Sequence, residues 1–282
     1  MISAIGIVGA GTMGAGIAQI CSAAGLHVTI VDINDAAVQR VVPQTSNYFD
    51  RMIKKGILSN TEKMEALSRI VGTSDYDALH AVDIVIEAAT ENFDLKCKIL
   101  GQVSSIVEES TIIASNTSSL SITKLATAVP NPQRFIGMHF FNPVPVMSLV
   151  EIIRGLQTSD DTHEKVEMLT RQVEKRPIAV KNSPGFAVNR LLCPMINEAF
   201  CVLGEGLAQA VDIDDAMKLG CNHPIGPLAL ADMIGLDTLL AVMEVLYTEF
   251  GDPKYRPAMY LREMVAAGYL GRKTGQGVYS YK

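Results

Sequence analysis

Residues 4–32 read AIGIVGAGTMGAGIAQICSAAGLHVTIVD, and several local patterns follow one another in this segment. A short apolar run ends at Val8, a glycine-rich turn follows, and a helix-like pattern then continues to Gly25. A second apolar run over residues 27–31 ends on Asp32. Strand, glycine turn, helix, strand and acid, in this order, predict a dinucleotide-binding βαβ unit.

The turn between the first strand and the helix reads GAGTMG and supplies what a dinucleotide needs. Gly9 permits a tight turn, Gly11 lets the backbone approach a pyrophosphate, and Gly14 lets the helix pack close to the sheet. The helix N-terminus offers free N–H groups and the positive end of its dipole to the phosphates. We therefore expect this turn, with Thr12 and Met13 in it, to bind the cofactor.

Asp32 selects between the two nicotinamide cofactors. A carboxylate at this position can accept hydrogen bonds from both ribose hydroxyls of the adenosine half. The same charge would repel a 2′-phosphate, and no arginine follows in Ile33-Asn34-Asp35 to attract one. The sequence therefore favours NAD over NADP.

The near absence of charge in residues 1–31 is also compatible with a membrane anchor, since His27 alone there can carry a side-chain charge. Glycines interrupt this run, however, and no basic residues precede it as they do in a signal peptide. Parallel strands and a helix buried on both sides explain the composition better. We expect no membrane partner.

The composition of the whole chain narrows the class of protein further. The chain has 24 basic and 30 acidic side chains and a formal net charge of −6, which disfavours a nucleic-acid partner. A polyanionic small ligand remains compatible if a few lysines are placed locally. The five cysteines are scattered and never spaced CxxC, so we expect a reducing, cytoplasmic location with no disulfide framework and no metal site.

Strand-like and helix-like segments alternate over residues 1–182, which predicts an α/β fold with a doubly wound, mostly parallel sheet. The expected strands are residues 2–8, 27–31, 70–73, 83–89, 111–115, 134–139, 150–153 and 177–180. The expected helices after the first one are residues 36–56, 60–67, 94–107, 122–129 and 163–175.

The pattern changes at KNSPG, residues 181–185, and we expect a second, all-helical domain over residues 183–282. Its expected helices are residues 186–204, 213–219, 226–250 and 255–267. The apolar residues from Leu228 to Leu246 suit either the core of a self-contained bundle or an interface. We expect part of this domain to pack against a second copy and to form a homodimer.

Two segments downstream of the dinucleotide unit carry candidate chemistry. His139 ends a predicted strand, and Glu151 lies on the strand that returns after two prolines, so the carboxylate can orient the imidazole as a general base. The SNTSSL run that contains Ser118 follows another strand, where hydroxyl groups can bind a substrate oxygen or cap a helix. Asn189 lies on the first helix of the second domain.

These motifs together resemble the L-3-hydroxyacyl-CoA dehydrogenase family. The resemblance rests on GAGTMG, SNTSSL, HFFNPVPVM followed by Glu151, SPGFAVNR and the terminal GRKTGQGVYSY, and it covers essentially the full chain. It implies a Rossmann-type NAD-binding domain, a helical substrate and dimerisation domain, and an acyl-CoA thioester as substrate. The similarity is greatest to stand-alone bacterial members that act on 3-hydroxybutyryl-CoA.

The resemblance also implies roles for individual residues. His139 matches the catalytic base and Glu151 its partner, while Ser118 and Asn189 match contacts to the substrate's oxygen atoms. The positions that match contacts to the cofactor are Glu91, Lys96, Ser118, Asn142 and Lys273. The positions that fall where the family places basic contacts to the CoA phosphates are Lys54 and Lys55.

Two other functions compete with this interpretation. A dehydrogenase of a sugar acid such as gulonate shares the fold and the His–Glu pair, but it would not need the basic pair at Lys54 and Lys55. A non-catalytic NAD-binding structural protein, as some lens proteins are, would have no reason to retain His139, Glu151 and Ser118 together with Asn189.

Overall fold

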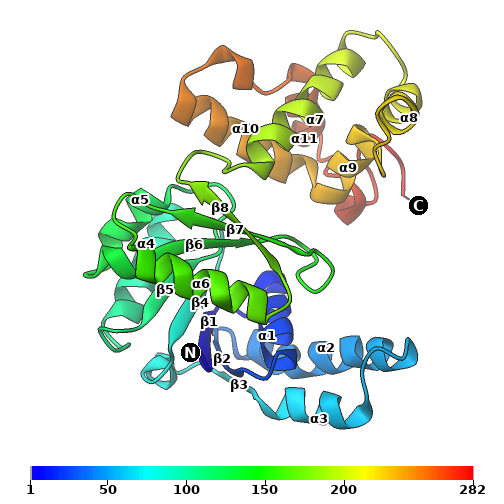
Figure 1. Cartoon of the computed structure of the whole chain (residues 1–282). Coiled ribbons are helices and arrows are strands. Elements are labelled where there is room, and N and C mark those ends of the chain that lie inside the picture. Colours follow the sequence, from blue (N-terminus) through cyan, green and yellow to red (C-terminus); the bar gives the residue numbers. More distant parts are fainter. Residues whose placement is uncertain (1, 282) are drawn as a thin grey trace. The chain divides into compact units, whose positions relative to one another are not determined.

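The structure is a computed structural model that describes residues 2–281 (Figure 1). The chain divides into two compact units, Met1–Ser183 and Pro184–Lys282. Within the described residues, no helix is both long enough and apolar enough to cross a membrane.

The described part of the first unit is built on an eight-stranded sheet with the order β3-β2-β1-β4-β5-β6-β7-β8. Neighbouring strands pair in parallel, except that β6 and β7 are antiparallel. The predicted doubly wound, mostly parallel sheet is therefore confirmed. The strands are β1 (Ala4–Val8), β2 (His27–Val31), β3 (Ile70–Thr73), β4 (Ile84–Glu87), β5 (Ile112–Ser115), β6 (Phe135–Phe140), β7 (Leu149–Arg154) and β8 (Arg176–Lys181).

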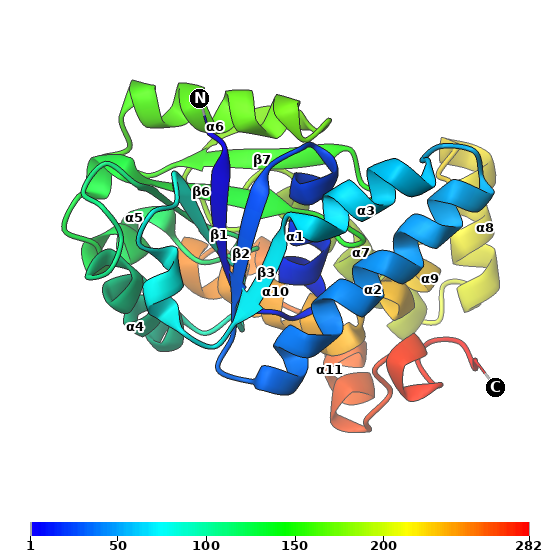
Figure 2. The same cartoon turned by 90° about the horizontal axis from the view of Figure 1, so that it is seen from below.

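Helices cover both faces of this sheet, and Figure 2 shows α6 on one side with α4 and α5 on the other. Ile17 of α1 and Val166 of α6 belong to one core cluster with Ile5 and Ile7 of β1. On the opposite face, the backbone of Gly137 lies against Ile122 of α5. The helices are α1 (Thr12–Ala23), α2 (Asp35–Lys54), α3 (Asn60–Ser68), α4 (Phe93–Ser104), α5 (Ile122–Leu125) and α6 (Asp160–Gln172), with short 3-10 turns η1 (Tyr76–Leu79), η2 (Ala126–Ala128) and η3 (Pro132–Arg134).

The helices begin where the sequence supplies a capping side chain. Asn34 accepts a hydrogen bond from the N–H of Ala37 at the start of α2, and Asn92 does the same for Leu95 in α4. Ser59 forms a capping box with Glu62 at the start of α3. The predicted helix over residues 122–129 is shorter than expected, since α5 ends at Leu125 and a 3-10 turn completes the segment.

The parallel strands end at one edge of the sheet, and the predicted motifs gather there. The GAGTMG turn follows β1, residues 88–91 follow β4, the 116–120 segment follows β5, and Asn142 lies just beyond β6. Strand order reverses beside β1, with β2 on one side and β4 on the other. Ligands of open α/β sheets bind at the carboxyl edge beside such a reversal.

The second unit is helical, as predicted, but one expected helix is broken. Residues 226–250 form two helices because Gly235 adopts φ 102°, a left-handed conformation that ends α9 before α10 begins. The elements are α7 (Val188–Gly204), α8 (Ala210–Cys221), α9 (Pro227–Ile234), α10 (Leu236–Phe250) and α11 (Met259–Ala266), with 3-10 turns η4 (Pro253–Tyr255) and η5 (Arg272–Thr274).

The apolar stretch from Leu228 to Leu246 serves mainly the core of this unit. Leu228, Leu239, Met243 and Leu246 are fully buried within it, together with residues of α7 and α11. Of the two alternatives that the sequence leaves open for this stretch, these four side chains therefore take the core of the unit. Apolar side chains that are exposed in this unit include Leu191, Leu207, Val211, Leu219, Met233 and Met259.

Candidate functional site

The glycine turn has the geometry that its sequence predicts. Gly9 has φ 105°, and a Cβ there would lie 2.8 Å from the carbonyl oxygen of Ala88. A Cβ on Gly14 would overlap the carbonyl oxygen of Gly9, so helix and turn touch backbone to backbone. At Gly11, by contrast, no described atom lies within 4 Å of the Cβ position. The turn is therefore tight where it packs and open where a ligand would approach.

Asp32 is fixed beside this turn. Its Oδ2 accepts a hydrogen bond from the N–H of Ala10 at 2.7 Å, and its Oδ1 accepts one from the N–H of Asn34 at 2.9 Å. Among residues 2–281, no side chain caps the N-terminus of α1. Open space at Gly11, an uncapped helix N-terminus and a fixed carboxylate together fit the phosphate and ribose groups of NAD.

His139 and Glu151 face each other across the antiparallel pair β6 and β7. The two residues are directly opposite in the strand register. Nδ1 of His139 lies 2.8 Å from Oε2 of Glu151, and both side chains are buried. A carboxylate in this position accepts the Nδ1 proton, so Nε2 is the nitrogen whose lone pair can take a proton from a substrate.

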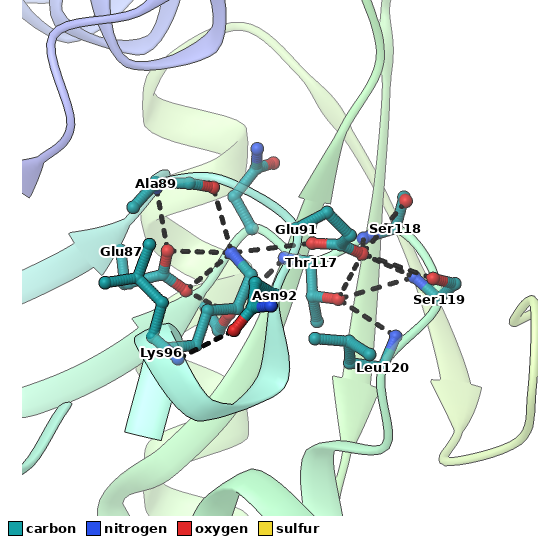
Figure 3. Close-up of polar contacts among 12 residues, drawn as sticks. Glu87, Ala89, Glu91, Asn92, Lys96, Thr117, Ser118, Ser119 and Leu120 are labelled. Carbon is teal, nitrogen blue, oxygen red and sulfur yellow. Dashed lines mark hydrogen bonds and ion pairs between the residues drawn. The ribbon is translucent and has the colours of Figure 1, made fainter. Parts of the chain in front are cut away.

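The turn that contains Ser118 is tied to two neighbouring elements. Asn116 accepts a hydrogen bond from the N–H of Phe140 at 2.9 Å, which links this turn to the strand end that carries His139. Glu91 accepts hydrogen bonds from Thr117 and from Ser118 (Figure 3). Ser118 is thus held at the same sheet edge as the glycine turn and the His139–Glu151 pair.

Lys96 is buried beside a second charged side chain. Its side chain is only 1% exposed, and its Nζ lies 2.7 Å and 2.9 Å from the two carboxylate oxygens of Glu87, which is itself fully buried. Two charges can be buried together when each satisfies the other. In this arrangement Lys96 contacts protein acceptors inside the unit, and its role at the cofactor remains a prediction.

A pocket of about 920 Å³ joins the glycine turn to the basic end of α2. Gly11 and Thr12 line it on one side, and Lys54 and Lys55 on another. Asn142 belongs to a third segment of its wall. Further lining residues, which sequence reasoning did not assign, are Gln19, Arg40, Tyr48 and Arg51.

Asn189 and Lys273, which the resemblance also assigns to the site, lie in the second unit. Asn189 is on the first turn of α7. Nζ of Lys273 forms an ion pair with Asp237 of α10 at 2.5 Å. Their roles therefore remain predictions.

Sequence reasoning did not assign Glu87, Thr117 or Ser119 to the site, although each has a local signal. Glu87 is a charged residue at the end of an otherwise apolar strand, which is unusual unless a buried partner is present. Thr117 and Ser119 flank Ser118 in a run of hydroxyl residues. Their common partner, Glu91, belongs to another loop, so their contacts depend on strand order.

Comparisons with known proteins identify the family. The chain matches the 3-hydroxyacyl-CoA dehydrogenase NAD-binding domain over residues 4–183 and the C-terminal domain of the same family over residues 185–281. The chain belongs to the 3-hydroxyacyl-CoA dehydrogenase family, and its first unit is an NAD-binding domain.

Individual relatives narrow the comparison. The chain is 45% identical to the 3-hydroxybutyryl-CoA dehydrogenase of Clostridioides difficile over 98% of this chain and 99% of the relative. It is 47% identical to the probable 3-hydroxybutyryl-CoA dehydrogenase of Bacillus subtilis over 100% and 98%. The crystal structure of (S)-3-hydroxybutyryl-CoA dehydrogenase PaaH1 from Ralstonia eutropha matches with a TM-score of 0.98 and 70% identity over the whole of both chains.

Proposed function

We propose that this protein interconverts (S)-3-hydroxyacyl-CoA and 3-ketoacyl-CoA with NAD(H), and that 3-hydroxybutyryl-CoA is its preferred substrate. The observation that carries the proposal is the buried His139–Glu151 pair at the carboxyl edge of a dinucleotide-binding sheet. The names of the full-length relatives support the choice of a short acyl chain.

The residues at this edge suit a proton transfer coupled to a redox step. NAD, when bound, supplies the hydride acceptor in one direction and the hydride donor in the other. Nε2 of His139 takes the proton of the 3-hydroxyl group, and Glu151 stabilises the imidazolium that forms. In the reverse direction the imidazolium returns this proton to the carbonyl oxygen. Ser118 and Asn189 hold that oxygen in line.

The GAGTMG turn and Asp32 would hold the adenosine half of the cofactor, as argued above. Among the other positions assigned to the cofactor, Asn142 lines the same pocket as this turn. Lys273, in the second unit, is proposed as a further contact. Glu91 and Lys96 are proposed as contacts to the nicotinamide and ribose side of the cofactor, as the resemblance implies.

The basic end of α2 would bind the phosphates of CoA. Lys54 and Lys55 line the pocket that also contains the glycine turn. A protein with a net charge of −6 must supply local positive charge to hold a polyanionic handle. Arg51, which lies 5.8 Å from the Tyr48 ring in the same pocket, adds to this charge.

The proposal is tested by following NADH oxidation with acetoacetyl-CoA, with longer 3-ketoacyl-CoA esters and with free acetoacetate. We expect the highest kcat/KM with acetoacetyl-CoA and a large loss with free acetoacetate, because the CoA contacts are missing. A higher kcat/KM for a CoA-free 3-keto sugar acid than for every thioester would contradict the proposal.

Two further features belong to this proposal. The described cysteines are all free, and Cys21 and Cys193 are buried, as suits a reducing compartment such as the cytoplasm. We also propose a homodimer formed through the helical unit. Exposed apolar side chains such as Leu207 and Leu219 support an interface there.

A further inference from the structure

One face of α1 forms part of the wall of the pocket that joins the glycine turn to the basic end of α2. The residues of this face recur at helical spacing and are Thr12, Ala15, Gly16 and Gln19. Val144, beyond β6, packs on the same face, because a Cβ on Gly16 would lie 2.9 Å from the Cβ of Val144. Helix α2, which contacts α1, supplies further wall residues (Figure 2). Ala15 and Gly16 have no polar side-chain atoms, so Gln19 supplies the polar group of this face beyond its first turn.

The side chain of Gln19 is buried without the hydrogen bonds that its chemistry requires. The residue is only 7% exposed, and its Nε2 has no hydrogen-bond partner among residues 2–281. A buried amide nitrogen without a partner lowers the stability of the folded protein, because it loses the hydrogen bonds that water would give it. The other such atom in the described part of the chain is Nε2 of His163, on α6, which contributes no residue to this pocket. An unpaired polar group at a pocket wall is explained when a ligand supplies the partner.

The position of Gln19 on α1 excludes the phosphates of NAD as this partner. Gln19 lies seven residues beyond Thr12, which is about 10 Å along the helix axis. The free N–H groups that bind phosphates are confined to the first turn of a helix. A side-chain amide is uncharged and carries both donors and an acceptor, so its natural complement is another neutral amide.

An acyl-CoA thioester brings such amides to this part of the pocket. Lys54 and Lys55 line one region of the wall, and Asn142, three residues beyond His139, lines another. A substrate that places its phosphates at the two lysines and its acyl group at His139 must lay its pantetheine arm between them. This arm is apolar apart from its hydroxyl group and two secondary amides, each with one N–H and one carbonyl oxygen. The apolar wall residues there are Val144, Pro145 and Val146.

We propose that Gln19 binds a secondary amide of the pantetheine arm of the acyl-CoA substrate. The inference rests on the proposed function, because that function places a CoA thioester in this pocket. Rotation by about 180° about the last side-chain bond exchanges the oxygen and nitrogen of the Gln19 amide. Gln19 can therefore accept the N–H of the arm or donate to its carbonyl oxygen.

The variant Gln19→Met separates this role from a structural one, because it keeps the length of the side chain and removes the amide. A structural amide would lower the Tm of the ligand-free protein when it is lost. An amide retained for a ligand is an unpaired buried group in the free protein, so its replacement by an apolar side chain should leave the Tm equal or higher. The matched control is Gln102→Met, the same substitution at an exposed position of α4.

Steady-state kinetics with three acetoacetyl thioesters test the contact itself. Acetoacetyl-CoA carries the amides and the phosphates, acetoacetyl-pantetheine carries the amides alone, and S-ethyl acetothioacetate carries neither. We expect Gln19→Met to raise the KM for the first two by about tenfold, and to change kcat/KM for the third by less than about twofold. The KM for NADH should stay within about twofold of the wild-type value. Gln102→Met should behave as the wild type with all three thioesters.

Equal losses with the amide-free thioester, or no loss with either amide-bearing substrate, would overturn the inference. A lowered Tm of ligand-free Gln19→Met would do the same, since it would make the amide structural. Calorimetric titration with CoA supplies a readout that needs no turnover, and its Kd should rise by about tenfold in Gln19→Met alone. If the wild type binds CoA in this Gln19-dependent way but does not reduce acetoacetyl-CoA, the proposed function fails and the contact stands. If it reduces acetoacetyl-CoA and Gln19→Met binds CoA equally tightly, the contact fails and the function stands.

Discussion

At the scale of single residues, we propose that Asp32 carries the preference for NAD over NADP. Its carboxylate accepts hydrogen bonds from the N–H groups of Ala10 and Asn34, which hold its charge beside the turn. Replacing Asp32 by Ser removes the acceptor for the ribose hydroxyls and the repulsion toward a 2′-phosphate. We expect kcat/KM with NADH to fall and the preference over NADPH to narrow, as measured by steady-state kinetics with both cofactors. A wild-type preference for NADPH would contradict this.

The lowered pKa of Glu91 predicts how the stability of the Ser118 turn depends on pH. Its pKa in the folded protein lies below 4.5, with Lys96 as the opposing charge and Glu87 behind Lys96. The stabilisation of the Ser118 turn is therefore fully present above the unfolded value and is lost only as the pH falls through the lowered value. From about pH 5 to about pH 9, the kcat profiles of wild type and Glu91→Gln should differ in height and share one shape. An inflection in this range that Glu91→Gln abolishes would contradict the lowered pKa of Glu91.

Residue identities at the site were more predictable than their contacts. GAGTMG, His139 and Glu151 follow from sequence because a strand end and a returning strand place their side chains in a fixed way. The burial of Lys96 could not be predicted, because its partner Glu87 faces it only after β4 and α4 pack together. The convergence of Thr117, Ser118 and Ser119 on Glu91 likewise depends on β4 and β5 being neighbours in the sheet.

We propose that helix α2 is the element that distinguishes a CoA thioester from a smaller substrate. Lys54 and Lys55 end this helix beside the pocket, while Lys63 of α3 forms an ion pair with Asp50 at 2.6 Å and holds α3 against α2. We expect the double substitution Lys54→Ala and Lys55→Ala to raise the KM for acetoacetyl-CoA by about tenfold and leave kcat largely intact, because a remote contact contributes equally to ground and transition states. The KM for NADH should not change.

The matched control for that variant is Lys124→Ala together with Lys165→Ala, which removes the same charge elsewhere on the first unit. The KM for the thioester should also become less sensitive to salt in the Lys54 and Lys55 variant and stay as sensitive as wild type in the control. An unchanged KM in the Lys54 and Lys55 variant would place the phosphate site elsewhere on the surface.

The sequence predicts one helix where the structure has two, because apolar periodicity does not show where the backbone turns. Apolar periodicity continues through residues 226–250, but the left-handed backbone of Gly235 divides them into α9 and α10. Periodicity likewise shows that Leu239 and Met243 are on one helical face without showing what covers that face. In the structure, the other helices of the same unit cover it. An apolar helix face that packs in the core and one that packs in an interface therefore have the same sequence pattern here.

At the scale of the whole molecule, the proposal predicts a dimer. Light scattering at micromolar concentration should give twice the mass of the chain. Because Leu228, Leu239 and Leu246 are in the core of the helical unit, polar substitutions there should unfold that unit. Leu207 and Leu219 are exposed, so replacing both by Asp should leave the fold intact and shift the mass toward the monomer if they lie in the interface. A wild-type monomer would refute the dimer.

The buried pair of His139 and Glu151 is the centre of the account, since Nδ1 and Oε2 lie 2.8 Å apart across β6 and β7. The most direct test is a double-mutant cycle on kcat for acetoacetyl-CoA reduction with His139→Ala, Glu151→Gln and both together, each checked for folding by circular dichroism. We expect each single variant to lose about 10²-fold or more with modest changes in KM, and the double variant to lose little beyond His139→Ala, because the two residues act as one unit. Losses that multiply in the double variant would show that Glu151 does not act through His139.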